Sequence, residues 1–426
     1  MKLGQRIVGI AVCILCYPIA LAARYFRKPE SSDPRIVWGS ISVINFAYWS
    51  SAMKEAGFKS TTFTSSVFDI NQRSDWDRIL DESYGRFPRG LKNVLAFASS
   101  IWKYDVFCMS FHGFFLGRYA PACRQAQILR LARRKSIILP FGGDGYVYKR
   151  IASFELAHAL QLSYPGMARR QKEIENMVDY WCEQADVILP GTMAPDGLGR
   201  WDLLSVSNLV LPINDWTSLK PASSMDGTNG EVVIVHSPNH REFKGTEFVL
   251  RSVQELQDEG LRVRLILLEK IANQVVRNVL TTEADILVEQ LLFPGYGLNA
   301  VEGMASGLPT ISNLSDDSRL KVYSRWTALK ECPLVSATPE TLTAVLRDLV
   351  TSPHLRGTLG AQGRRYVEKH HSFEAGVKLF SAVLAFAFGE RDSLANLDYA
   401  LCETGNSNQS DRRCYITSAD QNQAKP

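Results

Sequence analysis

Two basic residues, Arg241 and Lys244, lie in a polar loop between a predicted strand over 231–236 and a predicted helix that opens at Thr246. The first N–H groups of a helix are unpaired and carry a partial positive charge, so an anion binds favourably there. With two side-chain cations added, the loop favours a diphosphate as its ligand. A solvated loop with incidental charges is the alternative interpretation. The other residues expected to contact the ligand here are His240, Gly245 and Thr246.

A second motif begins with Gly-Tyr-Gly at 295–297 and enters a predicted helix over 298–306. Glycines allow a ligand to approach the backbone closely. Glu302 lies about one turn inside the helix, and its carboxylate can accept hydrogen bonds from a pair of ribose hydroxyls. A plain turn and an exposed helix charge are the alternatives. The candidate binding residues of this motif are Gly295, Tyr296, Gly297, Leu298, Asn299 and Glu302.

The first half of the chain offers two more candidates, each after a predicted strand. His112 follows the strand over 106–111, and Asp144 lies among glycines after the strand over 136–141. Ligands of open α/β sheets bind beyond the carboxyl ends of the strands, so both side chains are placed to face a cleft. We expect a catalytic role for His112 and a cleft-lining role for Asp144. A structural histidine and a structural turn are the competing interpretations.

Taken together, the two later motifs resemble the donor-binding half of glycosyltransferase family 4, which belongs to the two-domain GT-B superfamily. The family's "KG" loop is matched by Lys244-Gly245-Thr246, and its "E-A-M-A-x-G-x-P" helix by residues 302–309, in the same order and at similar spacing. The specific motifs are confined to residues 231–312. The resemblance implies a GT-B fold, in which two doubly wound Rossmann-like domains face a cleft.

The resemblance also implies the roles of individual residues. Arg241 and Lys244 would hold the phosphates of a UDP- or GDP-sugar and stabilise the leaving diphosphate, without a metal or other cofactor. Glu302 would bind the ribose, and His112 matches a histidine that contacts the transferred sugar. The sequence departs from the family at two positions. Pro294 stands where a further Glu is usual, and Asn239 stands where the usual Arg precedes the Lys, with Arg241 as its replacement.

The elements around these motifs predict an α/β protein with parallel sheets, because strands and helices alternate on both sides of a linker-like stretch over 213–230. Further strands are expected at 35–42, 58–64, 187–189, 262–268, 286–289 and 309–312. Helices are expected at 43–56, 91–102, 125–134, 172–184, 246–259, 273–281, 339–351, 353–370 and 373–388. The predicted domains are an acceptor-side domain over 35–212 and a nucleotide-sugar domain over 231–371. A helix within 372–390 is expected to return to the first domain, and 391–426 to form a disordered tail.

Composition is that of a globular protein. Of 426 residues 46% are hydrophobic and 22% charged, which excludes a fibrous or wholly disordered chain. The net charge of +4 is too small by itself to indicate nucleic acid, and no nucleic-acid-binding module is visible. The eight cysteines include a single close pair, Cys13 and Cys16, inside an apolar segment. We therefore expect reduced thiols and neither a zinc site nor a disulfide framework.

The N-terminus carries an apolar run over 7–23, with basic residues on both sides. A short membrane anchor or an in-plane interfacial helix is expected over 1–28, because basic residues directly after the run favour the cytoplasmic face of a membrane. The run is short for a spanning helix and contains Pro18. A cleaved signal, with a secreted or lumenal protein, is the alternative, since 20–22 form a small-x-small site.

Basic runs in the first domain suggest an anionic membrane surface as a partner, although solvated helix faces are the commoner explanation. The basic residues are Arg130, Arg133, Arg134, Lys135, Lys149, Arg150, Arg169, Arg170 and Lys172. The aromatic residues expected to accompany them are Trp102, Phe111, Phe114, Phe115 and Tyr119.

The predicted function is transfer of a sugar, with retention of configuration, to a glycan or a polyprenyl-diphosphate-linked glycan in polysaccharide biosynthesis. The alternatives are a catalytically inactive GT-B scaffold and a nucleotide-sugar epimerase.

Overall fold

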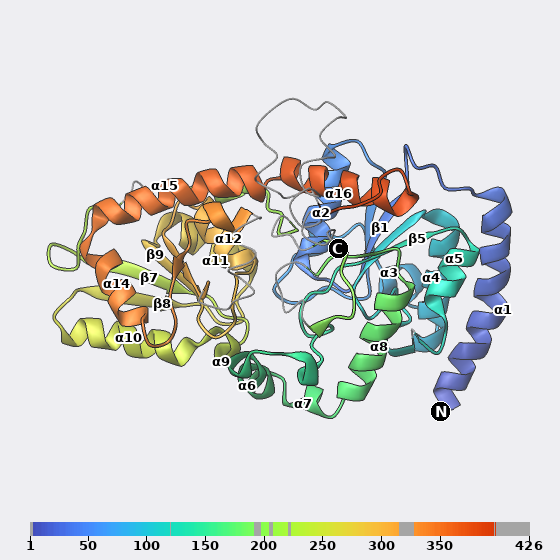
Figure 1. Ribbon diagram of the computed structural model, residues 1–426, viewed down its shortest axis with the longest axis horizontal. Coiled ribbons are helices and arrows are strands. Elements are labelled where there is room, and N and C mark those ends of the chain that lie inside the picture. The colour runs from blue at the N-terminus through green and yellow to red at the C-terminus, as the bar shows by residue number, and fades with distance from the viewer. Residues whose placement is uncertain are drawn as a thin grey trace, which may run out of the picture.

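The computed structural model describes residues 3–119, 121–190, 197–203, 208–219, 223–314, 328–395 and 397. Its ribbon shows two lobes side by side along the longest axis, each built on a sheet with helices against it (Figure 1). All the strand pairs described in both sheets are parallel. The α/β class expected from the alternating pattern is therefore confirmed.

The sheet of the first lobe has the strand order β3-β2-β1-β4-β5-β6, which reverses direction beside β1 as in a doubly wound fold. Its strands are β1 (Ile36–Ser40), β2 (Ser60–Thr64), β3 (Arg78–Ile79), β4 (Val106–Met109), β5 (Lys135–Ile138) and β6 (Val187–Ile188). The helices that connect them are α2 (Ile44–Glu55), α3 (Leu80–Tyr84), α4 (Arg89–Lys103), α5 (Gln125–Leu131), α6 (Phe154–Ser163), α7 (Pro165–Ala168) and α8 (Gln171–Gln184). Every residue of β1 and β4 is buried, as expected where helices cover both faces.

The sheet of the second lobe has the order β11-β10-β9-β7-β8. Its strands are β7 (Val232–His236), β8 (Val263–Leu267), β9 (Ile286–Gln290), β10 (Thr310–Ser312) and β11 (Val335–Ser336). The helices are α9 (Arg241–Lys244), α10 (Thr246–Asp258), α11 (Asn273–Thr282), α12 (Leu298–Ala305), α14 (Leu342–Thr351) and α15 (Pro353–His370). Because β7 lies inside the sheet between β8 and β9, the loops after β7 and β9 leave the same edge next to each other.

Helix α16 (Phe373–Phe388) follows α15 and crosses to the first lobe, where it packs on α2. The Phe380 ring meets the Trp38 ring edge-on at a centroid distance of 4.9 Å and lies 5.6 Å from the Trp49 ring. Figure 1 shows α15 and α16 running over one side of both lobes. The last helix therefore contributes to the core of the first lobe.

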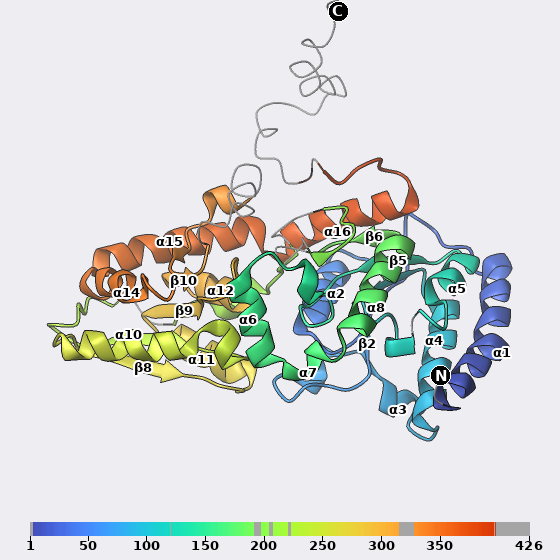
Figure 2. The same ribbon diagram turned by 60° about the horizontal axis from the view of Figure 1, so that its bottom comes forward.

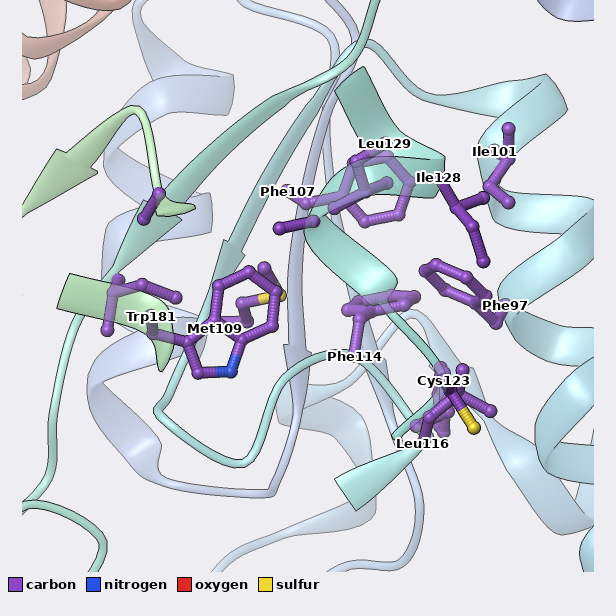
Figure 3. Packing of buried hydrophobic residues seen from close by; sticks show 14 of the residues in the cluster. Phe97, Ile101, Phe107, Met109, Phe114, Leu116, Cys123, Ile128, Leu129 and Trp181 are labelled. Carbon is purple, nitrogen blue, oxygen red and sulfur yellow. The ribbon is translucent and has the colours of Figure 1, made fainter. Parts of the chain in front are cut away.

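On the other face of the first sheet, a second core lies under α4, α5 and α8 and contains Phe97, Phe107, Phe114 and Trp181 (Figure 3). Phe111 and Phe115 belong to the same cluster. The expectation that Phe111, Phe114 and Phe115 form an aromatic membrane surface is therefore wrong. These three rings follow β4 directly and are drawn into the core, where burial of an aromatic side chain gives a large hydrophobic gain.

Helix α1 (Leu3–Phe26) is longer than the apolar run that predicts it, and it continues through Pro18. It packs along α4 and also contacts α5, at the end of the first lobe that lies farthest from the second (Figures 1 and 2). Of the predicted tail, the residues at 396 and from 398 onward lie outside the described part of the chain.

Candidate functional site

The loop after β7 forms one helical turn, α9, where the sequence pattern predicts a loop. Gly245 ends this turn in the left-handed region, with φ of +77°, and starts α10. A Cβ atom at Gly245 would come within 3.0 Å of Leu291 Cβ, so glycine serves both the conformation and the close packing. The turn carries Lys244 to the carboxyl end of β9.

Lys244 reaches two acceptors there. Its Nζ donates to Glu289 Oε1 at 2.5 Å and to Gln290 Oε1 at 2.6 Å. The Glu289 carboxylate is buried, and it also accepts from the backbone N–H of Gly297 at 3.3 Å. Ser312 Oγ lies 3.1 Å from its second oxygen.

This carboxylate therefore occupies the point where a lysine ammonium and the start of α12 converge, and we call that point the anion position. Gly297 is the N-cap of α12, so its N–H lies at the positive end of the helix dipole. A Cβ atom at Gly297 would lie 3.1 Å from Glu289 Oε1, which explains the need for a glycine. Glu289 is not among the predicted site residues. The available signal was a charged and polar pair, Glu289-Gln290, that ends an otherwise apolar strand.

Arg241 is not brought to the anion position. Its guanidinium pairs with Glu247 Oε1 and with Glu269 Oε2, each at 2.7 Å, at the partly exposed start of α10. Arg241 and Lys244 thus lie on the same turn but contact different carboxylates.

The hydroxyl of Thr246 points into the protein. It lies 2.9 Å from His236 Nε2, while His236 Nδ1 lies 2.7 Å from the carbonyl of Val288. A carbonyl can only accept, so Nδ1 donates to it and Nε2 accepts from Thr246. Burial lowers the pKa of His236 to about 4, which keeps this neutral tautomer over the physiological range. Thr246 therefore ties the start of α10 to β7 and β9, and only its backbone N–H is left for a ligand role.

Glu302 is buried in α12, with both carboxylate oxygens engaged. Oε1 accepts from Asn273 Nδ2 and Oε2 from Asn299 Nδ2, each at 3.0 Å, and Ser237 Oγ donates to Asn299 Oδ1. Burial raises the pKa of Glu302 to about 7, against the two amide hydrogen bonds, which lower it. Tyr48 of α2 in the first lobe packs beside this region, and the pKa of its hydroxyl is raised by burial and by the charge of Glu302. Glu302 therefore lies at the boundary between the lobes.

Tyr296 turns away from that boundary. Its hydroxyl lies 2.8 Å from Tyr366 Oη and 3.1 Å from His371 Nε2, inside the second lobe. Gly295 beside it has a φ of +105°, and Leu298 is partly buried. The ring of Tyr296 thus anchors the Gly-Tyr-Gly turn to α15, and the backbone of the turn faces the anion position.

In the first lobe, Asp144 is fully buried and accepts from the backbone N–H groups of Phe111, Phe141 and Gly142. Burial raises its pKa, and the nearby His112 opposes the rise. Such a carboxylate holds the loops after β4 and β5 together, so its side chain does not line a cleft. His112 stacks on Phe141 at 5.9 Å, and its buried Nδ1 has no partner among the described residues.

The two lobes meet around the site, in part through α6 and α9, which the sequence pattern does not predict. Tyr164, after α6, packs its ring 4.6 Å from the His240 ring. Phe293 lies 5.0 Å from Phe243 of α9 and 6.4 Å from Tyr146 of the first lobe. On another side, the backbone N–H of Asn273 donates to the backbone carbonyl of Ile70. The loops after β7 and β9 are therefore enclosed by the first lobe.

Several of the basic residues expected to form a membrane-facing patch have intramolecular partners. Arg134 is buried and pairs with Asp105 at 3.0 Å. Lys149 and Arg150 pair with Glu175, and Arg170 with Glu173. Arg134 is thus a structural counter-ion of Asp105 and no part of a surface, because an unpaired buried charge is too costly to keep.

No family model matches the chain, and no curated protein matches it. Solved structures do resemble it. A glycosyltransferase from Rickettsia africae ESF-5 aligns with a TM-score of 0.51 at 10% identity, covering 84% of this chain and 100% of that one. An alpha-glucosyltransferase in complex with UDP and a 13-mer DNA aligns with a TM-score of 0.50 at 9% identity, covering 82% and 98%. At this identity the likeness concerns the fold alone, and it shows that the chain has the GT-B arrangement of two Rossmann-like domains.

Proposed function

We propose that this protein is a glycosyltransferase that moves a sugar from a UDP- or GDP-sugar to a glycan or lipid-linked glycan. The observation that carries the proposal is the convergence of Lys244 Nζ and the Gly297 N–H on one buried oxygen pair. A lysine ammonium at a helix N-terminus is a site for phosphate oxygens. In this structure the Glu289 carboxylate occupies it.

In the proposed reaction the bond between the sugar's anomeric carbon and the diphosphate oxygen breaks, and an acceptor hydroxyl bonds to that carbon and loses its proton. Negative charge grows on the leaving diphosphate. Lys244 and the first N–H groups of α12 are aimed at that charge, so they stabilise the transition state more than the ground state. Arg241 is the second cation for the phosphates, and it must leave Glu247 and Glu269 to serve.

The remaining roles follow from position. Glu302, held by two asparagine amides, is the acceptor for ribose hydroxyls at the lobe boundary. His112 follows β4, its Nδ1 has no partner within the part of the chain that the structure describes, and it is the first-lobe group for the transferred sugar. Retention of configuration and independence of metal remain part of the proposal, and they rest on the motif resemblance.

The test is a thermal-shift screen with UDP- and GDP-sugars, followed by a transfer assay. A ligand at about 100 times its Kd stabilises the folded state by about 2.7 kcal/mol, a shift that is easily measured. We expect one nucleotide sugar to raise Tm in the wild type and in Lys378→Ala, which removes an exposed cation of α16. Lys244→Ala should lose the shift. Absence of any shift in the wild type, or an undiminished shift in Lys244→Ala, would contradict the proposal.

The pairing of Lys244 with Glu289 and Gln290 equally suits a silent GT-B protein whose cation is permanently occupied. The same proteins separate the two functions. A scaffold binds the nucleotide sugar without releasing UDP or GDP from it, whereas the enzyme releases nucleotide at a rate that Lys244→Ala lowers.

A further inference from the structure

Helix α1 is built into the first lobe by one of its faces. Val8, Val12, Cys16, Ala20 and Ala23 recur every three or four residues and are buried in the same core cluster as residues of α4. A Cβ atom at Gly90 of α4 would lie 3.3 Å from Val8 Cγ2, so the two helices approach closely there. Helix α1 therefore lies along the domain over most of its length (Figures 1 and 2).

The opposite face of α1 is apolar and uncovered. Ile10, Ile14 and Leu21 are 59%, 65% and 46% exposed, respectively. We call the exposed face the outer stripe, and its residues are Ile10, Cys13, Ile14, Pro18, Leu21 and Tyr25. No charged residue occurs between 7 and 23. The water-facing side of a helix in a soluble protein is normally charged or polar, so the outer stripe calls for an apolar partner.

The chemistry at one end of the stripe identifies that partner. Arg27, Lys28 and Lys103 are exposed where α1 ends beside the end of α4. Trp102 of α4 is exposed next to them, and the Arg27 guanidinium lies 5.8 Å from its ring centroid. Basic side chains with exposed Trp and Tyr rings at the border of an apolar stripe match the headgroup region of an anionic bilayer.

We propose that the outer stripe lies in the plane of an anionic lipid surface and docks the first lobe on it. A membrane-spanning α1 is incompatible with this packing, because α4 carries Lys92 and Lys103 and would have to enter the hydrocarbon alongside it. Lipid docking goes beyond sugar transfer and does not depend on it, so each can fail while the other holds.

The first experiment measures co-sedimentation of the full-length protein with phosphatidylcholine vesicles that contain or lack phosphatidylglycerol. We expect binding that requires the anionic lipid. Ile14→Glu places a charge on the outer stripe and should weaken binding by about ten-fold or more, since burial of the isoleucine is lost. The matched control is Leu219→Glu, at a residue 77% exposed elsewhere on the surface, and it should bind like the wild type. Equal binding by Ile14→Glu and the wild type would overturn the proposal.

The second experiment measures depth with lipids brominated at different positions along the acyl chain. Ile14→Trp and Leu21→Trp are compared after subtraction of the wild-type fluorescence. The two positions are about 10 Å apart along the helix axis, and Ile14 lies next to the middle of the apolar run over 7–23. An in-plane helix gives both probes the same shallow quenching profile, whereas a spanning helix places position 14 near the bilayer centre and position 21 well away from it, which would refute the in-plane geometry. A lipid-free dimer that Ile14→Glu dissolves, with no vesicle binding by the wild type, would assign the stripe to a second copy of the chain instead.

Discussion

At the anion position, the negatively charged Glu289 carboxylate occupies the place where the proposed diphosphate would bind. The Glu289 carboxylate already neutralises Lys244 at 2.5 Å, and an arriving diphosphate would be repelled by it. Two unit charges 4 Å apart interact by about 4 kcal/mol at the effective dielectric of a protein surface. Glu289→Gln keeps the shape and removes the charge. We therefore expect this variant to bind inorganic diphosphate and UDP at least about ten-fold more tightly, as measured by titration calorimetry.

The matched control is Glu247→Gln, which removes an exposed carboxylate beside Arg241 and should change diphosphate affinity by less. Unchanged or weaker binding by Glu289→Gln would mean that the Lys244–Glu289 pair is a structural tie that never opens to a ligand.

The buried carboxyl group of Glu302 should make the stability of the protein depend on pH. Its folded-state pKa is about 7, raised by burial from 4.5, so the folded protein holds this proton more tightly than the unfolded chain does. Glu302 does not change the free energy of unfolding below the unfolded-state pKa. That free energy falls as pH rises from the unfolded-state pKa to the folded-state pKa, and it stays reduced at higher pH. A pKa shift of this size lowers the free energy of unfolding by about 3 kcal/mol at high pH.

The measurement compares Glu302→Gln with the wild type from about pH 5 to about pH 8. The Tm of the variant minus that of the wild type should increase with pH across this range. A constant offset from altered hydrogen bonding with Asn273 and Asn299 cancels in this comparison. A pH-independent difference would show that Glu302 is already ionised at the lower end.

Motif spacing predicts some residues of the candidate site and misses others. Lys244, Gly297 and Glu302 are marked by motif spacing, and in the structure Lys244 and Gly297 both contact the Glu289 carboxylate while Glu302 is held by two asparagine amides. Tyr296 and Thr246 belong to the same motifs, yet their side chains turn inward. Side-chain direction depends on rotamer and packing, which spacing does not encode. Glu289 has no predicted role, because spacing alone does not show that a carboxylate at the end of an apolar strand is buried against a lysine.

At the scale of elements, Gly245 and Gly260 form a matched pair around α10. Both have a left-handed backbone, with φ of +77° and +89°. Each Gly→Ala change costs about 1 kcal/mol for that conformation. At Gly245 the new Cβ also meets Leu291 at 3.0 Å, whereas at Gly260 nothing lies within 4 Å. We expect Gly245→Ala to be less stable than Gly260→Ala by about 1–3 kcal/mol, the usual cost of overpacking.

Urea denaturation of the two variants measures the difference, and diphosphate binding adds a second readout. Binding should weaken in Gly245→Ala alone, because the displaced turn moves Lys244. Equal midpoints for the two variants would mean that Leu291 yields without cost and that the turn is looser than its packing indicates.

The elements that carry strong periodicity were predictable, and the short ones were not. The predicted strands over 231–236, 262–268 and 286–289 differ by a residue or two from β7, β8 and β9. Buried parallel strands are nearly continuous apolar runs, which makes them easy to see. The four-residue helices α7 and α9 are too short for a periodic pattern, and they depend on contacts with distant parts of the chain. Helix α1 was found as an apolar run, but only the structure separates its packed face from its outer stripe.

At the scale of the whole molecule, the β-α rhythm on both sides of a linker predicts two doubly wound domains but does not predict how they face each other. Their contacts come from residues far apart in the sequence, such as Tyr164 with His240 and Asn273 with Ile70. Figure 1 also shows α1 and the second lobe at opposite ends of the long axis. A lipid surface under α1 would therefore stand off from the site, which suits a glycan that extends away from its lipid.

An apolar cluster of α6, α9 and the loop after β9 joins the two lobes beside the site. Leu160 of α6 is fully buried there with Tyr146 from its own lobe and with Phe243 and Phe293 from the other. Leu160→Asp would place an unpaired charge in this contact, and burying such a charge is far more costly than exposing it. We expect the lobes of this variant to separate, with a larger radius of gyration in small-angle X-ray scattering and weaker nucleotide-sugar binding.

Leu162→Asp, on the same helix at a residue 51% exposed, is the control and should scatter like the wild type. Superimposable scattering curves for Leu160→Asp and the wild type would mean that α15 and α16, and not this cluster, hold the lobes together. An increase that saturating nucleotide sugar reverses would instead show that the ligand draws the lobes together by binding between them.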